Sequence, residues 1–136
     1  MRFFLDNNLP PVWAEALTAL VRNDGHEVLH LRQKFLANVT DVEWLTRLAS
    51  EGGWVIISGD VRITRNQHER QVWLRSGLVG FFMGKAWASH PFWEKSWRIV
   101  RWWPRVVQQA QLVKAPVGFE IPVNFGSGRF TPMSLK

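Results

Sequence analysis

Hydrophobic and polar positions follow two spacings along this chain, and these spacings predict its strands and helices. Short apolar runs bounded by turn-forming residues predict four strands. Between them, apolar residues recur every three or four positions, which is the spacing of amphipathic helices. The predicted strands are Arg2–Leu5, His26–Leu31, Trp54–Ser58 and Leu78–Met83, and the predicted helices are Leu9–Arg22, one starting at Asp41, one ending near Ser76, and His90–Val113.

Strands and helices alternate in this prediction from the first residue to the last helix. Such alternation is typical of α/β domains, in which helices cover both faces of a mainly parallel sheet. The length of 136 residues suits one domain, and no linker or internal repeat divides it. We therefore predict one three-layer α/β/α sandwich over residues 1–136. Its last helix is long, basic and rich in tryptophan, Pro104 either kinks or splits it, and the tail predicts a terminal hairpin around a Gly-rich turn.

Composition narrows the classes of function. The chain has no cysteine, which excludes a disulfide framework, a thiolate metal site and a thiol nucleophile. No stretch reaches the ~18 consecutive apolar residues of a membrane span, and the first residues lack the pattern of a signal peptide. We therefore expect a cytoplasmic protein without a membrane partner.

Charge is divided unevenly along the chain. Residues 1–61 contain 5 Lys and Arg against 8 Asp and Glu, whereas residues 62–136 contain 12 against 3. A basic half attracts polyanions such as nucleic acids, and an acidic half can gather carboxylates into a site. A basic surface without any role in nucleic-acid binding explains the charge equally well at this stage.

Carboxylates stand at the predicted carboxyl edge of the sheet. Asp6 ends the first strand, Asp60 follows the third, and Asp41 and Glu43 occupy the first turn of the helix after the second. In a parallel sheet, the carboxyl ends of strands and the N-termini of the following helices share one edge. Ionised carboxylates so close together repel one another unless a cation intervenes, and oxygen ligands favour Mg²⁺ or Mn²⁺. The sequence therefore predicts a metal site built from these residues.

Each of these side chains also has a structural interpretation. Asp6 can cap the first helix, Asp41 can complement the helix dipole, and Asp60 can serve as a turn residue. Thr40 and Glu43 match a capping box, in which the glutamate binds the helix start. Whether Glu43 is a metal ligand or only a cap stays open. The joint arrival of three aspartates at one edge favours the metal site.

The order of the segments LDNNLP, TDVEWL and VIISGD resembles that of the PIN-like nuclease domains. Over roughly residues 1–85, the chain resembles in particular the compact branch related to VapC toxins. The resemblance implies a hydrolase: a Mg²⁺- or Mn²⁺-dependent endoribonuclease for single-stranded or structured RNA, often the toxin of a toxin–antitoxin pair. It implies catalytic and metal-binding roles for Asp6, Asp41 and Asp60, with Glu43 the candidate for a fourth acidic position, and accessory roles for Asn8 and Ser58.

The basic half supplies candidate contacts to RNA phosphates. One group of arginines follows Asp60 directly, and a second recurs along one face of the last helix. Next to the second group, Trp93, Trp97 and Val100 form an apolar stripe, which is either core, a protein interface or a surface for base stacking. The predicted RNA-binding residues are Arg62, Arg65, Arg70, Arg98, Arg101 and Arg105.

Nine tryptophans in a chain of this size also predict an apolar surface for a partner, either an antitoxin protein or a second copy in a homodimer. Two other functions compete with the nuclease. A non-catalytic nucleic-acid-binding module on a degenerate nuclease fold would need the basic half but not the aspartates. A phosphate-receiving domain of the response-regulator kind would need a lysine opposite the aspartates, and Lys85 is the candidate.

Overall fold

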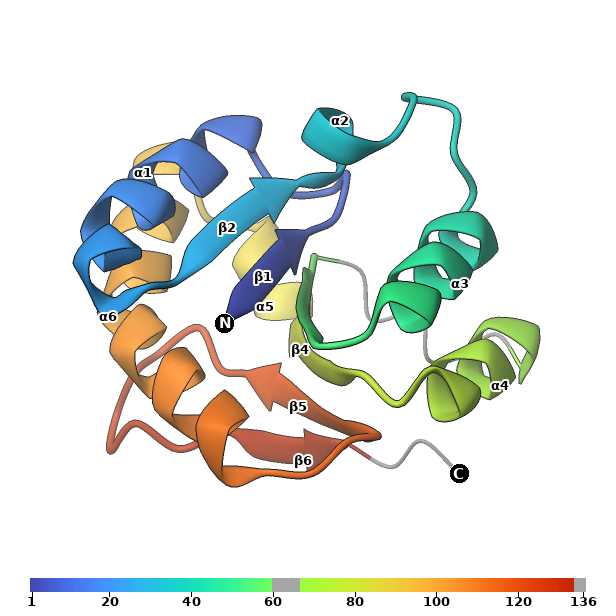
Figure 1. The fold of residues 1–136 in the computed structure, drawn as a ribbon. Helices are drawn as coiled ribbons and strands as arrows, with labels where there is room; N and C mark the ends of the chain where they lie inside the picture. Colours follow the sequence, from blue (N-terminus) through green and yellow to red (C-terminus); the bar gives the residue numbers. More distant parts are fainter. Residues whose placement is uncertain (60–66, 134–136) are drawn as a thin grey trace.

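The computed structural model describes residues 1–59 and 67–133. Six strands in these ranges form one sheet in the order β2-β1-β3-β4-β5-β6 (Figure 1). The pairs from β2 to β5 are parallel, and β6 pairs antiparallel with β5. The strands are β1 (Arg2–Leu5), β2 (Glu27–His30), β3 (Trp54–Ser58), β4 (Val79–Met83), β5 (Val117–Ile121) and β6 (Thr131–Met133).

Helices cover both faces of the sheet, so the predicted three-layer α/β/α sandwich is confirmed (Figure 1). One face packs against α1, α5 and α6, and the other packs against α3 and α4. Since both faces are covered, β3 and β4 are buried along their whole length, which explains their continuous apolar runs. The helices are α1 (Pro11–Val21), the 3₁₀ turn η1 (Arg22–Asp24), α2 (Leu31–Lys34), α3 (Asp41–Glu51), α4 (Gln67–Ser76), α5 (Lys85–Ala88) and α6 (Phe92–Leu112).

The last helix resolves the question raised by Pro104. α6 runs without interruption through this proline. Pro104 has no N–H group to donate to the carbonyl of Val100, one turn earlier. Both residues lie on the exposed side of α6, where water can donate to this carbonyl instead. Although α6 has 21 residues, neither it nor another helix in the described ranges is long and apolar enough to cross a bilayer.

Tryptophan builds the core rather than a broad apolar surface. Seven of the nine side chains are at most 3% exposed and lie on both faces of the sheet. Phe4 illustrates the packing, because its ring contacts those of Trp44 and Trp54 at centroid distances of 5.1 and 6.2 Å. The two exceptions, Trp93 and Trp97, are both on α6.

Two short helices, α2 and α5, are absent from the sequence prediction. α2 begins directly after β2 because His30 acts as its cap. The His30 ring accepts a hydrogen bond from the Arg32 backbone amide at 3.1 Å, and the Gln33 side chain accepts one from the His30 amide at 2.7 Å. Histidine is not among the usual cap residues, so periodicity and cap rules give no sign of this helix.

Candidate functional site

The carboxyl end of β1 lies at a topological switch point. β1 pairs with β2 on one side and with β3 on the other. The connection after β1 therefore leads to one side of this strand, and the connection after β2 leads back across to its other side. In open α/β sheets the crevice outside such strand ends is the preferred ligand site. Asp6 follows β1 directly at this point, and Ser58 ends β3 beside it.

The Asp6 carboxylate is buried and held by three donors. Its side chain is 4% exposed. Oδ1 accepts hydrogen bonds from the backbone amides of Asn8, at 3.1 Å, and Gly59, at 3.2 Å. The Ser58 hydroxyl donates to Oδ2. The ends of β1 and β3 therefore fix both carboxylate oxygens, and the accessory role of Ser58 in the reaction stays a prediction. Asn8 contributes its backbone amide, while its side chain is exposed.

Burial raises the pKa of Asp6 from 3.8 to about 6. The hydrogen bonds from Ser58, Gly59 and Asn8 oppose this rise because they stabilise the charged form. The negative charge of Asp41 adds a smaller upward contribution, so the two carboxylates are close enough to interact. Near neutral pH, Asp6 is therefore a carboxylate that a nearby positive charge would stabilise.

Asp41 lies in the first turn of α3, as predicted. Its Oδ1 accepts a hydrogen bond from the buried indole of Trp44 at 3.0 Å, one helical turn later. The position of the helix start is fixed by the predicted capping box: Thr40 Oγ1 accepts from the Glu43 amide at 3.2 Å, and Glu43 Oε2 accepts from the Thr40 amide at 3.0 Å. Asp41 is therefore held by a capped helix and by a core side chain.

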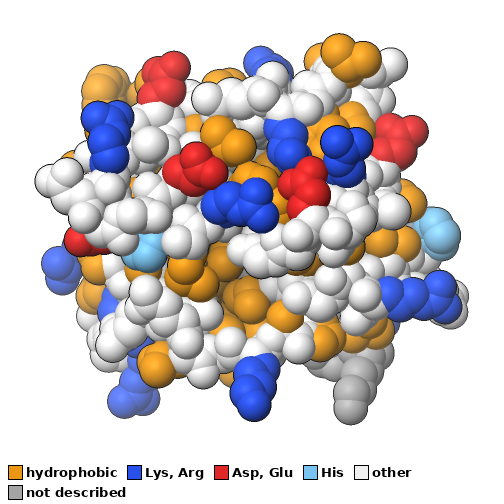
Figure 2. Space-filling view, viewed as in Figure 1, with side chains coloured by type: hydrophobic (Ala, Val, Ile, Leu, Met, Phe, Trp, Pro, Cys, Tyr) orange, Lys and Arg blue, Asp and Glu red, His pale blue; other side chains and the backbone are white. Residues whose placement is uncertain are grey.

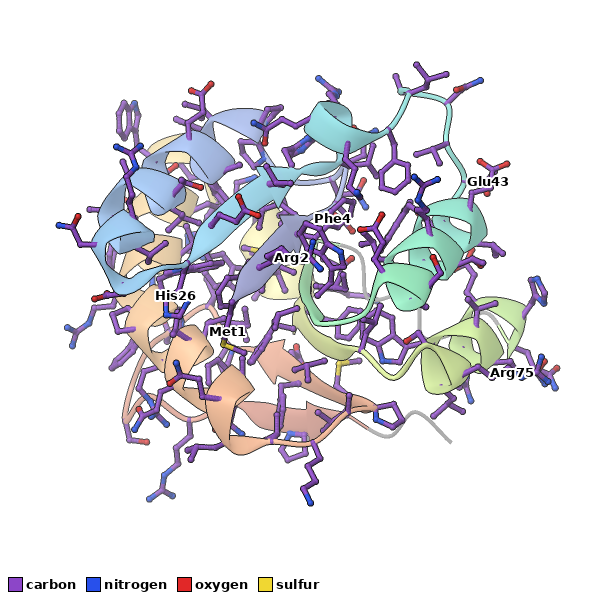
Figure 3. The ribbon with its side chains drawn as sticks, in the orientation of Figure 1. Met1, Arg2, Phe4, His26, Glu43 and Arg75 are labelled. Atoms are coloured by element: carbon purple, nitrogen blue, oxygen red, sulfur yellow. The ribbon has the colours of Figure 1, made fainter. Side chains whose placement is uncertain are left out.

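Glu43 makes the cap contact and lies at the exposed start of α3 (Figure 3). A further carboxylate, Glu120, lies on β5. Its Oε1 atom is so close to Gly84 that a Cβ atom added at Gly84 would lie 2.0 Å from it. β5 is three strands from β1, and strand spacing puts them ~14 Å apart. Among the described residues, Asp41 is the carboxylate whose charge acts on Asp6.

His30 supports the loop that follows Asp6, residues 6–10, and the sequence did not indicate this role. The side chain is fully buried at the end of β2, opposite Leu5 in the strand register. Nε2 donates to the Leu9 carbonyl at 2.8 Å, while Nδ1 accepts from the Arg32 amide. Burial lowers the pKa of His30, which favours the neutral ring, and the two hydrogen bonds select its tautomer. The signal available in the sequence was a histidine at a strand end, one strand from Asp6.

The family model described as PIN-like domain matches residues 1–85, more than half of the chain. The chain belongs to the PIN-like domain family. Comparisons with curated proteins and with solved structures gave no match. PIN-like domains are generally nucleases that act on nucleic acids, typically with divalent metal ions. The matched region contains Asp6, Asp41 and His30, whereas α6 and the terminal hairpin lie beyond it.

The donor set of this PIN-like domain is compatible with a hard divalent cation but incomplete in the described ranges. Asp6 and Asp41 supply carboxylate oxygens, the ligand type that Mg²⁺ and Mn²⁺ prefer. In residues 1–59 and 67–133, no three His, Cys, Asp or Glu side chains are grouped to hold a metal ion. The third predicted ligand, Asp60, lies outside the described residues, as do Arg62 and Arg65.

The three arginines of α6 that were predicted to bind RNA make contacts within the domain. Arg70 lies in the first turn of α4 and is partly buried. Arg98 donates to the Val123 carbonyl at 3.0 Å, and Arg105 donates to the Gly128 carbonyl at 2.9 Å. The Arg101 guanidinium lies over the Phe125 ring, 4.3 Å from its centroid. These three arginines of α6 therefore hold the loop between β5 and β6. RNA binding by the predicted arginines stays a prediction.

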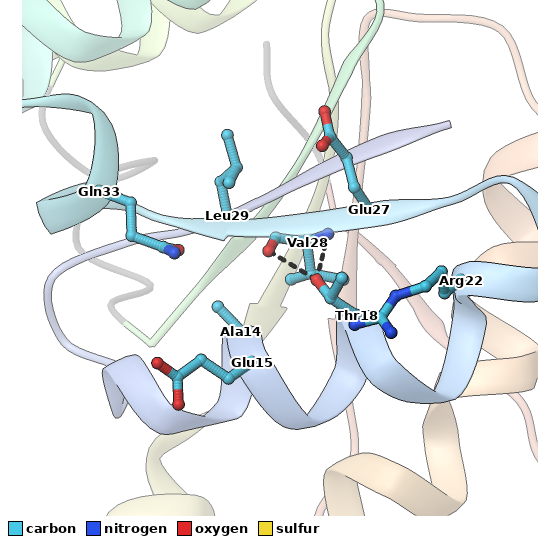
Figure 4. A pocket seen from close by; sticks show the side chains of 8 residues that line it. All are labelled: Ala14, Glu15, Thr18, Arg22, Glu27, Val28, Leu29 and Gln33. Carbon is cyan, nitrogen blue, oxygen red and sulfur yellow. Dashed lines mark hydrogen bonds between the residues drawn. The ribbon is translucent and has the colours of Figure 1, made fainter.

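A hollow between α1 and β2 lies apart from Asp6 (Figure 4). β2 is the edge strand of the sheet, and Thr18 covers its outer backbone groups: the hydroxyl donates to the Val28 carbonyl and accepts from the Val28 amide, both at 2.9 Å. This contact protects the strand edge from pairing with another chain. The hollow is lined by Ala14, Glu15, Thr18, Arg22, Glu27, Val28, Leu29 and Gln33.

Proposed function

We propose that this PIN-like domain is a metal-dependent endoribonuclease that hydrolyses phosphodiester bonds in RNA, with Asp6, Asp41 and Asp60 as its acidic site. The observation that carries the proposal is the Asp6 carboxylate. It is buried at the switch point, its pKa is raised, and a second aspartate lies near enough to raise it further. Burying a carboxylate there costs stability, and a bound cation would offset that cost.

The residues around the site have distinct roles in this proposal. Ser58 and the amides of Asn8 and Gly59 hold Asp6 in one orientation. The capped start of α3 and the Trp44 indole hold Asp41. A divalent cation held by these carboxylates would polarise the scissile phosphate and lower the pKa of an attacking water. Net positive charge elsewhere on the chain (Figure 2) would attract the RNA backbone.

A cleavage assay on end-labelled single-stranded RNA tests this function. We expect cleavage by the wild-type protein with Mn²⁺ or Mg²⁺, none with EDTA, and none by Asp6→Asn or Asp60→Asn. The matched control is Glu15→Gln, which removes an exposed carboxylate beside the α1–β2 hollow and should cleave like wild type. Thermal melting of each variant distinguishes lost activity from lost folding.

RNA binding without cleavage under every metal would instead favour the non-catalytic nucleic-acid-binding module. Cleavage that persists in both Asp6→Asn and Asp60→Asn would remove the acidic site from the mechanism. Stable phosphorylation of one aspartate by a small phosphodonor would support a phosphate-receiving domain.

We further propose that the protein is the toxin of a toxin–antitoxin pair. Support comes from the resemblance of the LDNNLP, TDVEWL and VIISGD segments to the compact toxin branch. Induced expression in a bacterial host is expected to arrest growth, and Asp6→Asn is expected to relieve the arrest at equal protein level. Normal growth with abundant, folded wild-type protein that cleaves RNA in vitro would argue against a toxin role.

A further inference from the structure

Two tryptophans remain exposed in a protein that buries the other seven. Trp93 is 78% exposed and Trp97 is 52% exposed, although large aromatic side chains are usually withdrawn from water. Together with Val100 they occupy positions i, i+4 and i+7 on α6, on the opposite side from the buried Ile99 and Trp102. We call Trp93, Trp97 and Val100 the outer stripe of α6.

The outer stripe lies near the edge of the sheet that carries Asp6. α6 follows β4 through the short helix α5, so its first turns start from the carboxyl edge of the sheet. α1 starts from the same edge, directly after the Asp6 loop. The Trp13 indole on α1 donates to Ser96 Oγ on α6 at 2.8 Å, which joins the two helices near their N-terminal ends. Ser96 is the immediate neighbour of Trp97.

Positive charge borders the outer stripe. Arg98 contacts Trp97, and the exposed Arg101 follows Trp97 by one helical turn, whereas Glu94 is the one acidic residue of α6. The Arg98 guanidinium lies 4.6 Å from the centroid of a Trp97 ring, and Glu94 accepts from the Trp97 indole at 3.0 Å, which orients that side chain. The surroundings of the stripe therefore match a polyanion.

We propose, building on the nuclease function above, that the outer stripe of α6 binds unpaired bases of the nucleic acid that enters the Asp6 site. The flat face of Trp93, and the face of Trp97 that Arg98 does not cover, stack on bases, and the exposed Arg101 contacts phosphates. Stacking requires the face of a base to be free, so single strands bind here and continuous duplexes do not. Neither tryptophan lies in the part of the chain that matches the PIN-like family.

Fluorescence anisotropy with a labelled single-stranded RNA and the same sequence in a duplex tests this surface, in EDTA and at fixed salt. Trp93→Ala/Trp97→Ala is expected to weaken single-strand binding by about tenfold or more, with duplex binding unchanged. Trp93→Phe/Trp97→Phe keeps aromatic faces and is expected to restore most of the affinity. Leu20→Ala and Leu112→Ala remove exposed apolar side chains, 62% and 73% exposed, and are expected to bind like wild type.

Unchanged single-strand affinity in the double alanine variant would overturn the inference, as would equal weakening for single strand and duplex. Unchanged affinity together with a shift from dimer to monomer in light scattering would instead make the stripe a protein interface. Binding is measured without cleavage, so the two proposals can fail separately. A wild-type protein that binds through the stripe but cuts no RNA would refute the nuclease function and retain the stripe.

Discussion

At the scale of single residues, burial and hydrogen bonding act on the Asp6 carboxyl group in opposite directions. Burial raises its pKa, and the donors from Ser58, Gly59 and Asn8 lower it. Burial dominates, which leaves the pKa at about 6 rather than 3.8. The folded protein therefore binds a proton here more tightly than the unfolded chain does. The favourable contribution of this group is complete below pH ~4 and is lost as the pH rises through about 6.

Asp6→Asn is accordingly expected to stabilise the metal-free protein near pH 8, by up to about 3 kcal/mol for the difference in pKa. The amide oxygen can still accept from the two backbone amides, and the amide nitrogen can donate to the Ser58 hydroxyl. Urea unfolding of wild type and variant at pH 4, 6 and 8 measures the difference.

The stabilisation should shrink toward pH 4, where the wild-type carboxyl is protonated. Glu51, whose pKa hydrogen bonding to Lys34 lowers to about 2, titrates in both proteins, so the comparison cancels its contribution. A variant less stable than wild type at pH 8 would show that the Asp6 charge serves the fold rather than a ligand.

At the scale of elements, rigid packing between α4 and β4 positions the helix that follows Asp60. Trp73 is fully buried, and its ring lies against the backbone of Gly80. A Cβ atom added at Gly80 would lie 2.2 Å from Trp73 Cζ2 and 2.5 Å from Cη2. The glycine is therefore required by close approach between the helix and the strand, and its backbone conformation plays no part.

Gly80→Ala is expected to destabilise the protein by about 1–3 kcal/mol, as overpacking of a core does. Trp73→Phe removes the two ring atoms that would clash, and the Trp73 indole nitrogen has no hydrogen-bond partner to lose. In a double-mutant cycle, Gly80→Ala should therefore cost much less when Trp73→Phe is present. Additive losses in denaturant unfolding would show that the ring moves aside without strain.

At the scale of the whole molecule, a metal ion that binds only the folded protein couples the site to global stability. Millimolar Mn²⁺ is expected to raise the melting temperature, because a free metal concentration of a hundred times Kd adds about 2.7 kcal/mol to the free energy of unfolding. Asp6→Asn should lose most of this increase, and Glu15→Gln should keep it. Differential scanning fluorimetry measures the melting temperatures. Equal shifts in all three proteins would indicate that the metal binds elsewhere.

The sequence alone determined the long helices, the buried strands and their alternation, but not the short helices α2 and α5. Strands β1, β3 and β4 and the Thr40–Glu43 capping box depend on local spacing and local hydrogen bonds, so their prediction succeeded. The same locality explains the family resemblance, which depends on three short segments and their order. The meeting of Asp6 with Ser58 was also predictable, because parallel strands must end at one edge.

Only the tertiary structure decided which side chains share their surroundings. His30 supports the Asp6 loop because β2 pairs with β1 in one particular register. The arginines of α6 contact the β5–β6 loop because that loop runs along the helix, from Val123 beside Arg98 to Gly128 beside Arg105. Trp102 is buried while Trp97 is exposed on the same helix. Apolar character is a property of a residue, whereas burial depends on what packs against it, and long-range contacts alone fix that.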